Sequence, residues 1–128
     1  MKALLDTSTF LWWILDSPRL SSRAREFIAD ARHELYFSAA SAWEISIKMD
    51  KGTLKLPKRP AVFLEQQLAD NSVQVLPVDL RHALQVAGLP PHHKDPFDRM
   101  LVAQAMIEGL AIVTSDEAIA QYTPEVIW

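Results

Sequence analysis

The chain of 128 residues contains no cysteine. This absence excludes disulfide scaffolds, thiolate zinc sites, iron–sulfur clusters and cysteine nucleophiles. Long apolar runs are missing too, since the apolar stretch over residues 10–15 is far shorter than the roughly 20 residues that span a bilayer. Asp6 interrupts the N-terminal apolar segment so early that no secretory signal forms. We therefore expect a cytoplasmic protein with no membrane partner.

The chain also lacks a surplus of positive charge. It has 13 basic and 16 acidic residues, a formal charge of −3, which does not indicate a protein that coats nucleic acid by bulk charge. Hydrophobic residues at 49% and charged residues at 23% are typical of an ordered globular domain. The most basic stretch, residues 48–59, is either a solvated helix end and loop or an edge that contacts phosphates.

Short apolar segments alternate with helical patterns along the chain. Strands are predicted at residues 3–5, 35–37, 73–78, 110–113 and, at the C-terminal end, 126–127. Helices are predicted at residues 10–15, 23–32, from about 41 to Gly52, and at 61–69, 80–87, 96–108 and 117–122. This alternation, with strands apolar on both faces, predicts an α/β sandwich around a parallel sheet.

Four acidic residues have a route to one cleft. Asp6 ends the first strand and Asp116 follows the fourth, and the carboxyl ends of parallel strands share one edge of a sheet. Asp98 lies in the first turn of the helix that begins at Pro96, and Glu44 lies early in the helix after the second strand. Each Asp could instead cap a helix or complement its dipole.

If the four acids do converge, their mutual repulsion calls for a cation. A set of oxygen ligands favours Mg²⁺ or Mn²⁺ over softer metals. Such a site would suit hydrolysis of phosphodiesters by a metal-activated water.

Four segments together resemble the PIN-domain family, and within it the VapC-type toxins of bacterial type II toxin–antitoxin systems. They are Leu-Leu-Asp-Thr-Ser at 4–8, Ser-Ala-Trp-Glu-Ile at 41–45, His-Lys-Asp-Pro-Phe-Asp-Arg-Met-Leu-Val-Ala-Gln-Ala at 93–105, and Ile-Val-Thr-Ser-Asp at 112–116. The third is the most specific, and the second is weak alone. The resemblance implies one PIN domain over residues 1–128, with a three-layer α/β/α sandwich around a short, mainly parallel sheet of four to five strands. It also implies a Mg²⁺- or Mn²⁺-dependent endoribonuclease.

The resemblance also assigns roles to individual residues. It implies that an acidic quartet is catalytic and binds the metal, namely Asp6, Glu44, Asp98 and Asp116. Residues that would orient this quartet are Thr7, Ser8, Thr114 and Ser115, with Asp95 in an outer shell. Ser8 departs from the His that is common in close relatives, and Asp116 stands where many members carry Asn.

The resemblance further implies three partners. They are an RNA substrate, a cognate antitoxin protein and a second copy of the chain in a homodimer. An apolar segment of the antitoxin would lie in a groove between toxin helices, with candidate walls at residues 10–15 and 61–69.

Several residues keep two interpretations. His92 and His93 either contact phosphate or carry a proton, or they are ordinary loop residues between prolines, which is the interpretation we favour. Arg99 could neutralise phosphate charge or orient a carboxylate. The candidates for RNA binding are Lys48, Lys51 and Arg99. We expect Trp12, Trp13 and Trp43 to be core or partner-facing apolar surface rather than stacking platforms for bases.

Two other functions compete with the nuclease. The first is a non-catalytic PIN module that binds RNA or a protein, which four intact acids argue against. The second is a phosphate-transfer enzyme that uses Asp6 as its nucleophile. Haloacid-dehalogenase-like phosphatases carry a second Asp two residues later, where this chain has Ser8.

Overall fold

A five-stranded, fully parallel sheet forms the centre of the protein in the computed structural model, which describes residues 1–128. The strand order is β3-β2-β1-β4-β5. The strands are β1 (Lys2–Leu5), β2 (Glu34–Ser38), β3 (Val73–Leu76), β4 (Ala111–Val113) and β5 (Val126–Ile127). The predicted α/β class and parallel sheet are confirmed.

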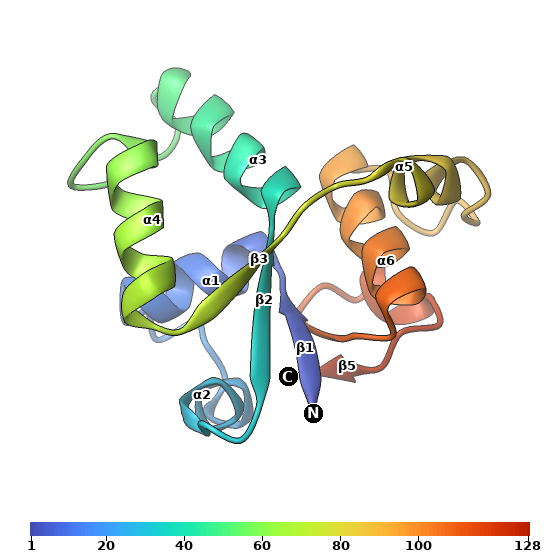
Figure 1. The fold of residues 1–128 in the computed structure, drawn as a ribbon, viewed down its shortest axis with the longest axis horizontal. Helices are drawn as coiled ribbons and strands as arrows, with labels where there is room; N and C mark the ends of the chain where they lie inside the picture. The colour runs from blue at the N-terminus through green and yellow to red at the C-terminus, as the bar shows by residue number, and fades with distance from the viewer.

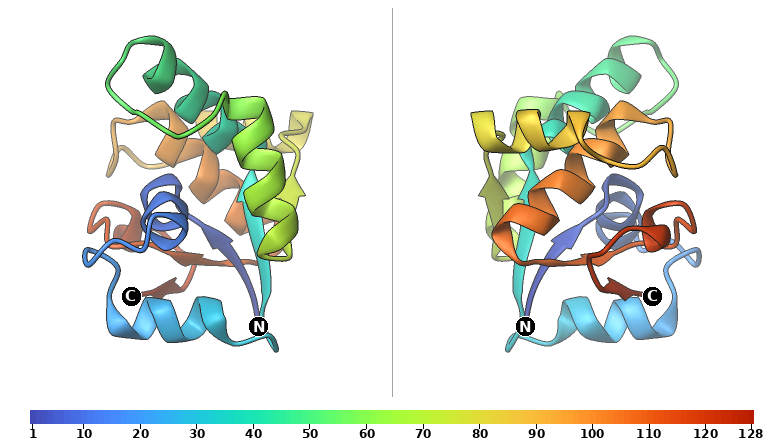
Figure 2. Two further views of the ribbon diagram at one scale, coloured as in Figure 1. Left: turned by 90° about the vertical axis from the view of Figure 1, so that its left-hand side faces the viewer. Right: turned by 90° about the vertical axis from the view of Figure 1, so that its right-hand side faces the viewer.

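Helices cover both faces of the sheet, as Figures 1 and 2 show. Figure 1 places α1, α2 and α4 on one side and α5 and α6 on the other. The helices are α1 (Thr7–Ile14), α2 (Ser22–Ala29), α3 (Ala39–Asp50), α4 (Pro60–Asp70), α5 (Leu80–Ala87) and α6 (Pro96–Glu108), with the short 3₁₀ helix η1 (Ile119–Gln121). None of them is long and apolar enough to cross a membrane.

Alternation along the strands divides the core into two layers. Leu5 and Phe37 face α1, where the Phe10 ring lies 4.5 Å from the Phe37 ring between centroids. Leu4 and Ile112 face the opposite side and pack in the same cluster as residues of α6. The result is the predicted three-layer sandwich, because short strands buried on both faces need a helical layer on each side.

Capping residues set most of the helix boundaries. The Asp6 side chain caps α1, Asp79 caps α5 and Asp95 caps α6, where Pro96 occupies the first turn. Gly109 ends α6 in the left-handed conformation, with a φ of 67°.

Several predicted boundaries were wrong. Helix α1 begins at Thr7 rather than at residue 10, because Asp6 caps it. Helix α2 ends at Ala29 rather than residue 32, because Asp30 is extended and its carboxylate binds the backbone and guanidinium of Arg32. Strand β3 ends at Leu76, since Pro77 has no N–H to donate to the sheet. The helix predicted at residues 117–122 is reduced to η1.

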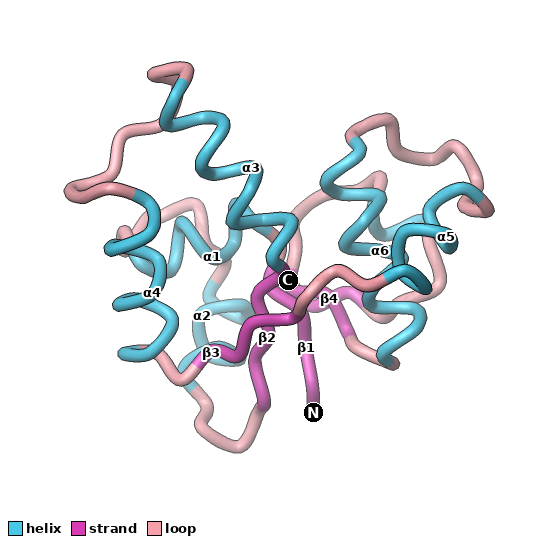
Figure 3. The backbone as a smooth tube through the Cα atoms, turned by 45° about the horizontal axis from the view of Figure 1, so that its top comes forward, coloured by secondary structure: helices cyan, strands magenta, loops and turns pink.

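The sheet register brings the functional segments to one edge. Leu5 pairs with Val113, and the Asp6 N–H donates to the Val113 carbonyl, so the chain leaves β1 and β4 side by side. Helix α3 starts directly after β2, and it lies on the other side of these strand ends from α6 (Figure 3).

Candidate metal centre

Asp6 is a buried carboxylate at this edge, and both of its oxygens are held by hydrogen bonds. Its Oδ1 accepts the Ser8 N–H at 2.7 Å, and its Oδ2 accepts the Thr114 hydroxyl at 2.5 Å. Burial raises the pKa of Asp6, and the hydrogen bonds from Thr114 and Ser8 only partly oppose that rise. The Thr114 oxygen also accepts the Asp116 N–H at 3.0 Å, which couples the two acidic segments.

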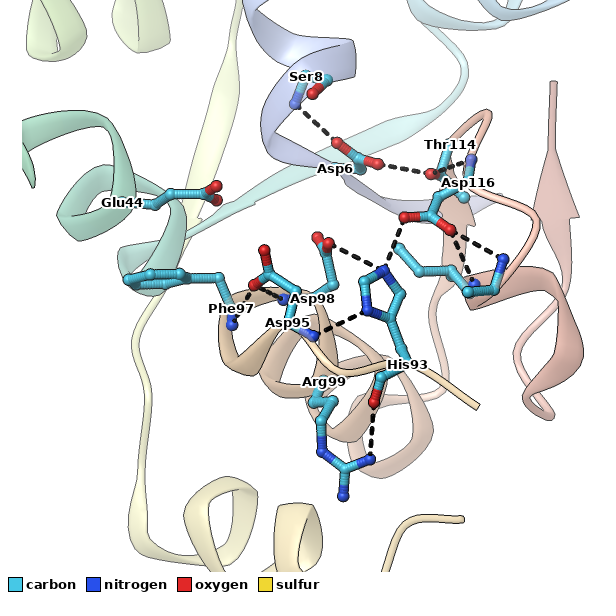
Figure 4. A network of polar contacts seen from close by, with 12 residues as sticks. Asp6, Ser8, Glu44, His93, Asp95, Phe97, Asp98, Arg99, Thr114 and Asp116 are labelled. Carbon is cyan, nitrogen blue, oxygen red and sulfur yellow. Dashed lines mark hydrogen bonds and ion pairs between the residues drawn. The ribbon is translucent and has the colours of Figure 1, made fainter. Parts of the chain in front are cut away.

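His93 lies between two of the predicted acids (Figure 4). Its Nε2 is 2.7 Å from Asp116 Oδ2 and 3.1 Å from Asp98 Oδ2. Its Nδ1 accepts the Asp95 N–H at 3.0 Å, so the ring proton belongs on Nε2. The interpretation of His93 as an ordinary loop residue was therefore wrong, whereas the His92 ring packs edge-on against Tyr122, with 5.0 Å between centroids.

The three groups titrate differently. Burial, followed by the negative charges of Asp6 and Asp95, raises the pKa of Asp98 to about 7. Burial works against ionised Asp116, but hydrogen bonds from His93 and the Ala118 N–H outweigh it and lower the pKa of Asp116. Burial likewise disfavours charged His93, yet contact with Asp116 and the nearby carboxylates raises its pKa.

Glu44 reaches the cluster from α3, and its carboxylate points toward the space between Asp6 and Asp98 in Figure 4. Its Oε2 accepts a hydrogen bond from Lys48 Nζ at 2.8 Å. Its Oε1 is buried and has no hydrogen-bond partner. A buried carboxylate oxygen without a partner is costly, so Glu44 Oε1 fits a metal ligand.

The donor set suits a hard divalent cation. The structure brings the four predicted acids to one place from four separate segments. His93 uses both ring nitrogens in hydrogen bonds, so the carboxylate oxygens are the available metal donors. Burial, and after it the neighbouring carboxylates, raises the pKa of Asp98, and the repulsion between the acids is the expected penalty without a cation. Oxygen donors of this kind match Mg²⁺ or Mn²⁺.

A second cluster, Asp79, His82 and Glu108, is less suited to a metal. His82 Nδ1 accepts the Asp79 N–H at 3.1 Å, and Nε2 lies 3.0 Å from Glu108 Oε1. Arg81 also pairs with both carboxylates. Both ring nitrogens are already used, so this cluster caps α5 and ties it to α6.

The predicted supporting residues contribute unequally. Thr114 orients two acids, and Asp95 caps the helix that carries Asp98. The Thr7 hydroxyl donates to the Ser41 hydroxyl at 2.7 Å and so links α1 to the helix that carries Glu44. Ser8 contributes its backbone N–H rather than its exposed side chain.

Arg99 does not contact the acids, so the predicted direct contact with a carboxylate was wrong, while its contact with RNA stays a prediction. Its guanidinium donates to four backbone carbonyls, those of Val86, Leu89, Pro90 and His93, at 3.0–3.3 Å. The Tyr122 hydroxyl supports the same loop, since it accepts the His93 N–H and donates to the Pro90 carbonyl. Arg99 therefore positions His93.

The other candidate surfaces are placed as follows. Lys48 lies at the cluster, while Lys51 is exposed at the C-cap of α3. Phe10 is fully buried against Phe37, so it cannot be a wall of the predicted antitoxin groove. Residues 11–14 of the same predicted wall are half-buried. On the other predicted wall, helix α4, Val62 is exposed.

Sequence reasoning undervalued His93 and missed Tyr122. His93 falls two residues before Asp95, inside the most specific motif, which was the available signal. Tyr122 lies outside the four motifs. Its role is visible only in the structure, where its hydroxyl holds the loop at Pro90 and His93.

Similarity to known proteins extends over nearly the whole chain. A family model described as PIN domain matches residues 3–123. Ribonuclease VapC22 of Mycobacterium tuberculosis is 30% identical over 129 residues, which cover 98% of this chain and 97% of that protein.

Solved structures show the same fold. A chain of VapBC2 from Rickettsia felis, crystallised with a DNA fragment from their promoter, has a TM-score of 0.68, 15% identity and full coverage of both chains. A chain of FitAcB from Neisseria gonorrhoeae has a TM-score of 0.68 and 21% identity, covering 98% of this chain and 96% of that one. At these identities, the structural likeness supports the fold alone.

Proposed function

The chain belongs to the PIN-domain family, and from this premise we propose that it is a metal-dependent endoribonuclease and the toxin of a type II toxin–antitoxin pair. Its relative in Mycobacterium tuberculosis is named a ribonuclease, and solved structures of similar fold include toxin–antitoxin complexes. The observation that carries the proposal is the convergence of Asp6, Glu44, Asp98 and Asp116 around an unpartnered Glu44 oxygen.

The four acids would hold Mg²⁺ or Mn²⁺. When bound, the ion would lower the pKa of a water molecule and offset charge on the scissile phosphate. Hydrogen bonds from the Ser8 N–H and the Thr114 hydroxyl fix the orientation of the Asp6 carboxylate. His93 presents its Nε2 proton to Asp98 and Asp116, which keeps both carboxylates directed at one point.

Lys48 is the best-placed cation for the RNA backbone. Its side chain is 49% exposed although its ammonium group reaches Glu44. The ammonium therefore lies at the boundary between the cluster and solvent, where a phosphate next to the scissile one would pass. Lys51 belongs to the same proposed path, further from the acids.

The partners follow from the same proposal. An antitoxin would place an apolar segment against the half-buried part of α1 and against α4, and a second copy of the chain would form a homodimer. We place the activity in the cytoplasm, within a single PIN domain over residues 1–128.

Cleavage of RNA tests the function. The purified protein is incubated with total RNA in Mg²⁺, in Mn²⁺ or in chelator, beside Asp98→Asn and the control Glu117→Gln. Glu117 is an exposed acid next to Asp116, so its variant makes the same charge change outside the cluster. We expect cleavage by the wild type and Glu117→Gln only with metal, and none by Asp98→Asn.

Two results would contradict this proposal. Equal cleavage by wild type and Asp98→Asn would refute the site. RNA binding without cleavage in either metal would favour a non-catalytic PIN module instead.

A further inference from the structure

An exposed tryptophan, Trp43, and a half-buried phenylalanine, Phe97, stand next to two of the acids in the chain. Trp43 is 65% exposed, so of the two predicted alternatives, core or partner-facing apolar surface, the core is excluded. Its ring meets the Phe97 ring edge-on, with 5.3 Å between centroids. Trp43 directly precedes Glu44 and Phe97 directly precedes Asp98, so each aromatic residue is the chain neighbour of a proposed metal ligand.

The pair lines the largest apolar hollow described on the protein. This pocket has a volume of about 520 Å³ and lies between α3, α5 and the start of α6. Its walls include Trp43, Val78, Ala83, Val86, Phe97 and Met100. The volume falls within the range of about 300–1,000 Å³ that is usual for small-molecule sites.

We propose that this pocket is a nucleobase subsite for the RNA substrate, beside the point of cleavage. The inference rests on the proposed ribonuclease function. An RNA strand whose phosphate lies at the cluster must place its flanking bases next to it, and Trp43 and Phe97 directly precede two of the acids in the chain. Bases are the apolar, planar part of RNA and stack on exposed aromatic rings.

The chemistry of the walls also indicates how the subsite selects. Eight of the nine lining residues are hydrophobic, so few groups are available to read the edge of a base by hydrogen bonds. Stacking tolerates every base because each has a π-face. The pocket should therefore strengthen binding of single-stranded RNA with little preference among the bases.

The test separates base contacts from backbone contacts. Binding of a short single-stranded RNA and of an abasic oligomer of equal length is measured by fluorescence anisotropy, with Ca²⁺ in place of Mg²⁺. The variants are Trp43→Ala, Trp43→Phe and the control Leu84→Ala, which removes an exposed apolar side chain on α5 outside the pocket walls. Thermal melting confirms that each variant folds, and Mg²⁺ titration confirms that Glu44 still binds metal.

We expect Trp43→Ala to weaken RNA binding by about 5- to 100-fold, the range for the loss of one base–aromatic stack. Binding of the abasic oligomer should not change, Trp43→Phe should recover most of the affinity, and Leu84→Ala should behave as wild type. Equal loss for both oligomers would overturn the proposal. So would a change from dimer to monomer in Trp43→Ala with RNA binding intact, because a second copy would then be the occupant.

Failure of the subsite and failure of the nuclease remain distinguishable. The subsite is measured by binding, whereas the proposed function is measured by metal-dependent cleavage. A wild type that cleaves RNA while Trp43→Ala binds both oligomers normally would remove the subsite and leave the ribonuclease in place.

Discussion

Replacement of Asp98 by Asn should stabilise the protein when no metal is present. The structure buries Asp98 and crowds it against Asp6 and Asp95, which raises its pKa from 3.8 to about 7. Each tenfold change in proton affinity corresponds to about 1.4 kcal/mol, so ionising Asp98 in the folded protein costs about 4 kcal/mol more than in the unfolded chain. Asn is neutral at every pH and avoids this cost.

The sign of the pH dependence follows from the raised pKa. Near pH 3.8 and below, Asp98 is largely protonated in both states and contributes nothing. Between 3.8 and about 7 the folded state retains the proton longer than the unfolded state, so the wild type loses stability as the pH rises. Above about 7 the whole penalty is present, and the advantage of Asp98→Asn is greatest.

Part of the stability gained by Asp98→Asn will be lost, because Asp98 also contacts His93 at 3.1 Å and Asn weakens that interaction. We therefore expect Asp98→Asn to exceed the wild type by about 1–4 kcal/mol at about pH 8, and by much less at about pH 4. Urea denaturation in chelator at several pH values measures this difference, with Glu117→Gln as the control. Added Mg²⁺ should stabilise the wild type and close the gap.

A single outcome would refute this reasoning. If Asp98→Asn were no more stable than the wild type above pH 7 in chelator, Asp98 would not be buried and crowded as the structure places it. The metal-centre proposal would then lose its electrostatic basis.

Three further predictions concern the residues around the acids. Lys48→Met should tighten Mg²⁺ binding in calorimetry, because it removes a cation 2.8 Å from Glu44, and should raise the KM for RNA. Lys51→Met should leave the Mg²⁺ affinity unchanged. Equal effects of the two variants would contradict the placement of Lys48 at the acids. Thr114→Val removes the hydroxyl that holds Asp6 and should weaken Mg²⁺ binding by about 10- to 100-fold in the same assay, whereas Ser115→Ala should not. Tyr122→Phe should lower the free energy of unfolding by about 1 kcal/mol in denaturant titration and should speed exchange of the His93 amide hydrogen. Unchanged exchange would refute the role of the Tyr122 hydroxyl in holding the loop of His93.

The sequence was informative where chemistry follows local chain order. Asp6 follows a short apolar strand and Asp116 follows another, and parallel strands must align their carboxyl ends. Their meeting could therefore be predicted before the strand order was known. Asp95 and Pro96 likewise identify the start of α6, because capping and a fixed proline φ act within one turn.

Arg99 shows why sequence neighbours mislead. It follows Asp98 directly, which suggested a shared role. Successive residues of a helix point about 100° apart, so Arg99 turns to the carbonyls of residues 86–93 while Asp98 faces the acids. His93 was undervalued for a related reason, since the path of an irregular, proline-rich loop has no period from which a direction can be predicted.

The sequence alone thus determined the α/β class and the parallel sheet, since these depend on periodicity and strand ends. It suggested the four acids through their places in the chain and through the resemblance to PIN domains. Only the tertiary structure decided that His93 bridges Asp98 and Asp116, that Lys48 reaches Glu44, and that Trp43 opens onto a pocket beside them. The reason is physical: contacts between separate elements depend on helix rotation and loop path, which no local pattern encodes.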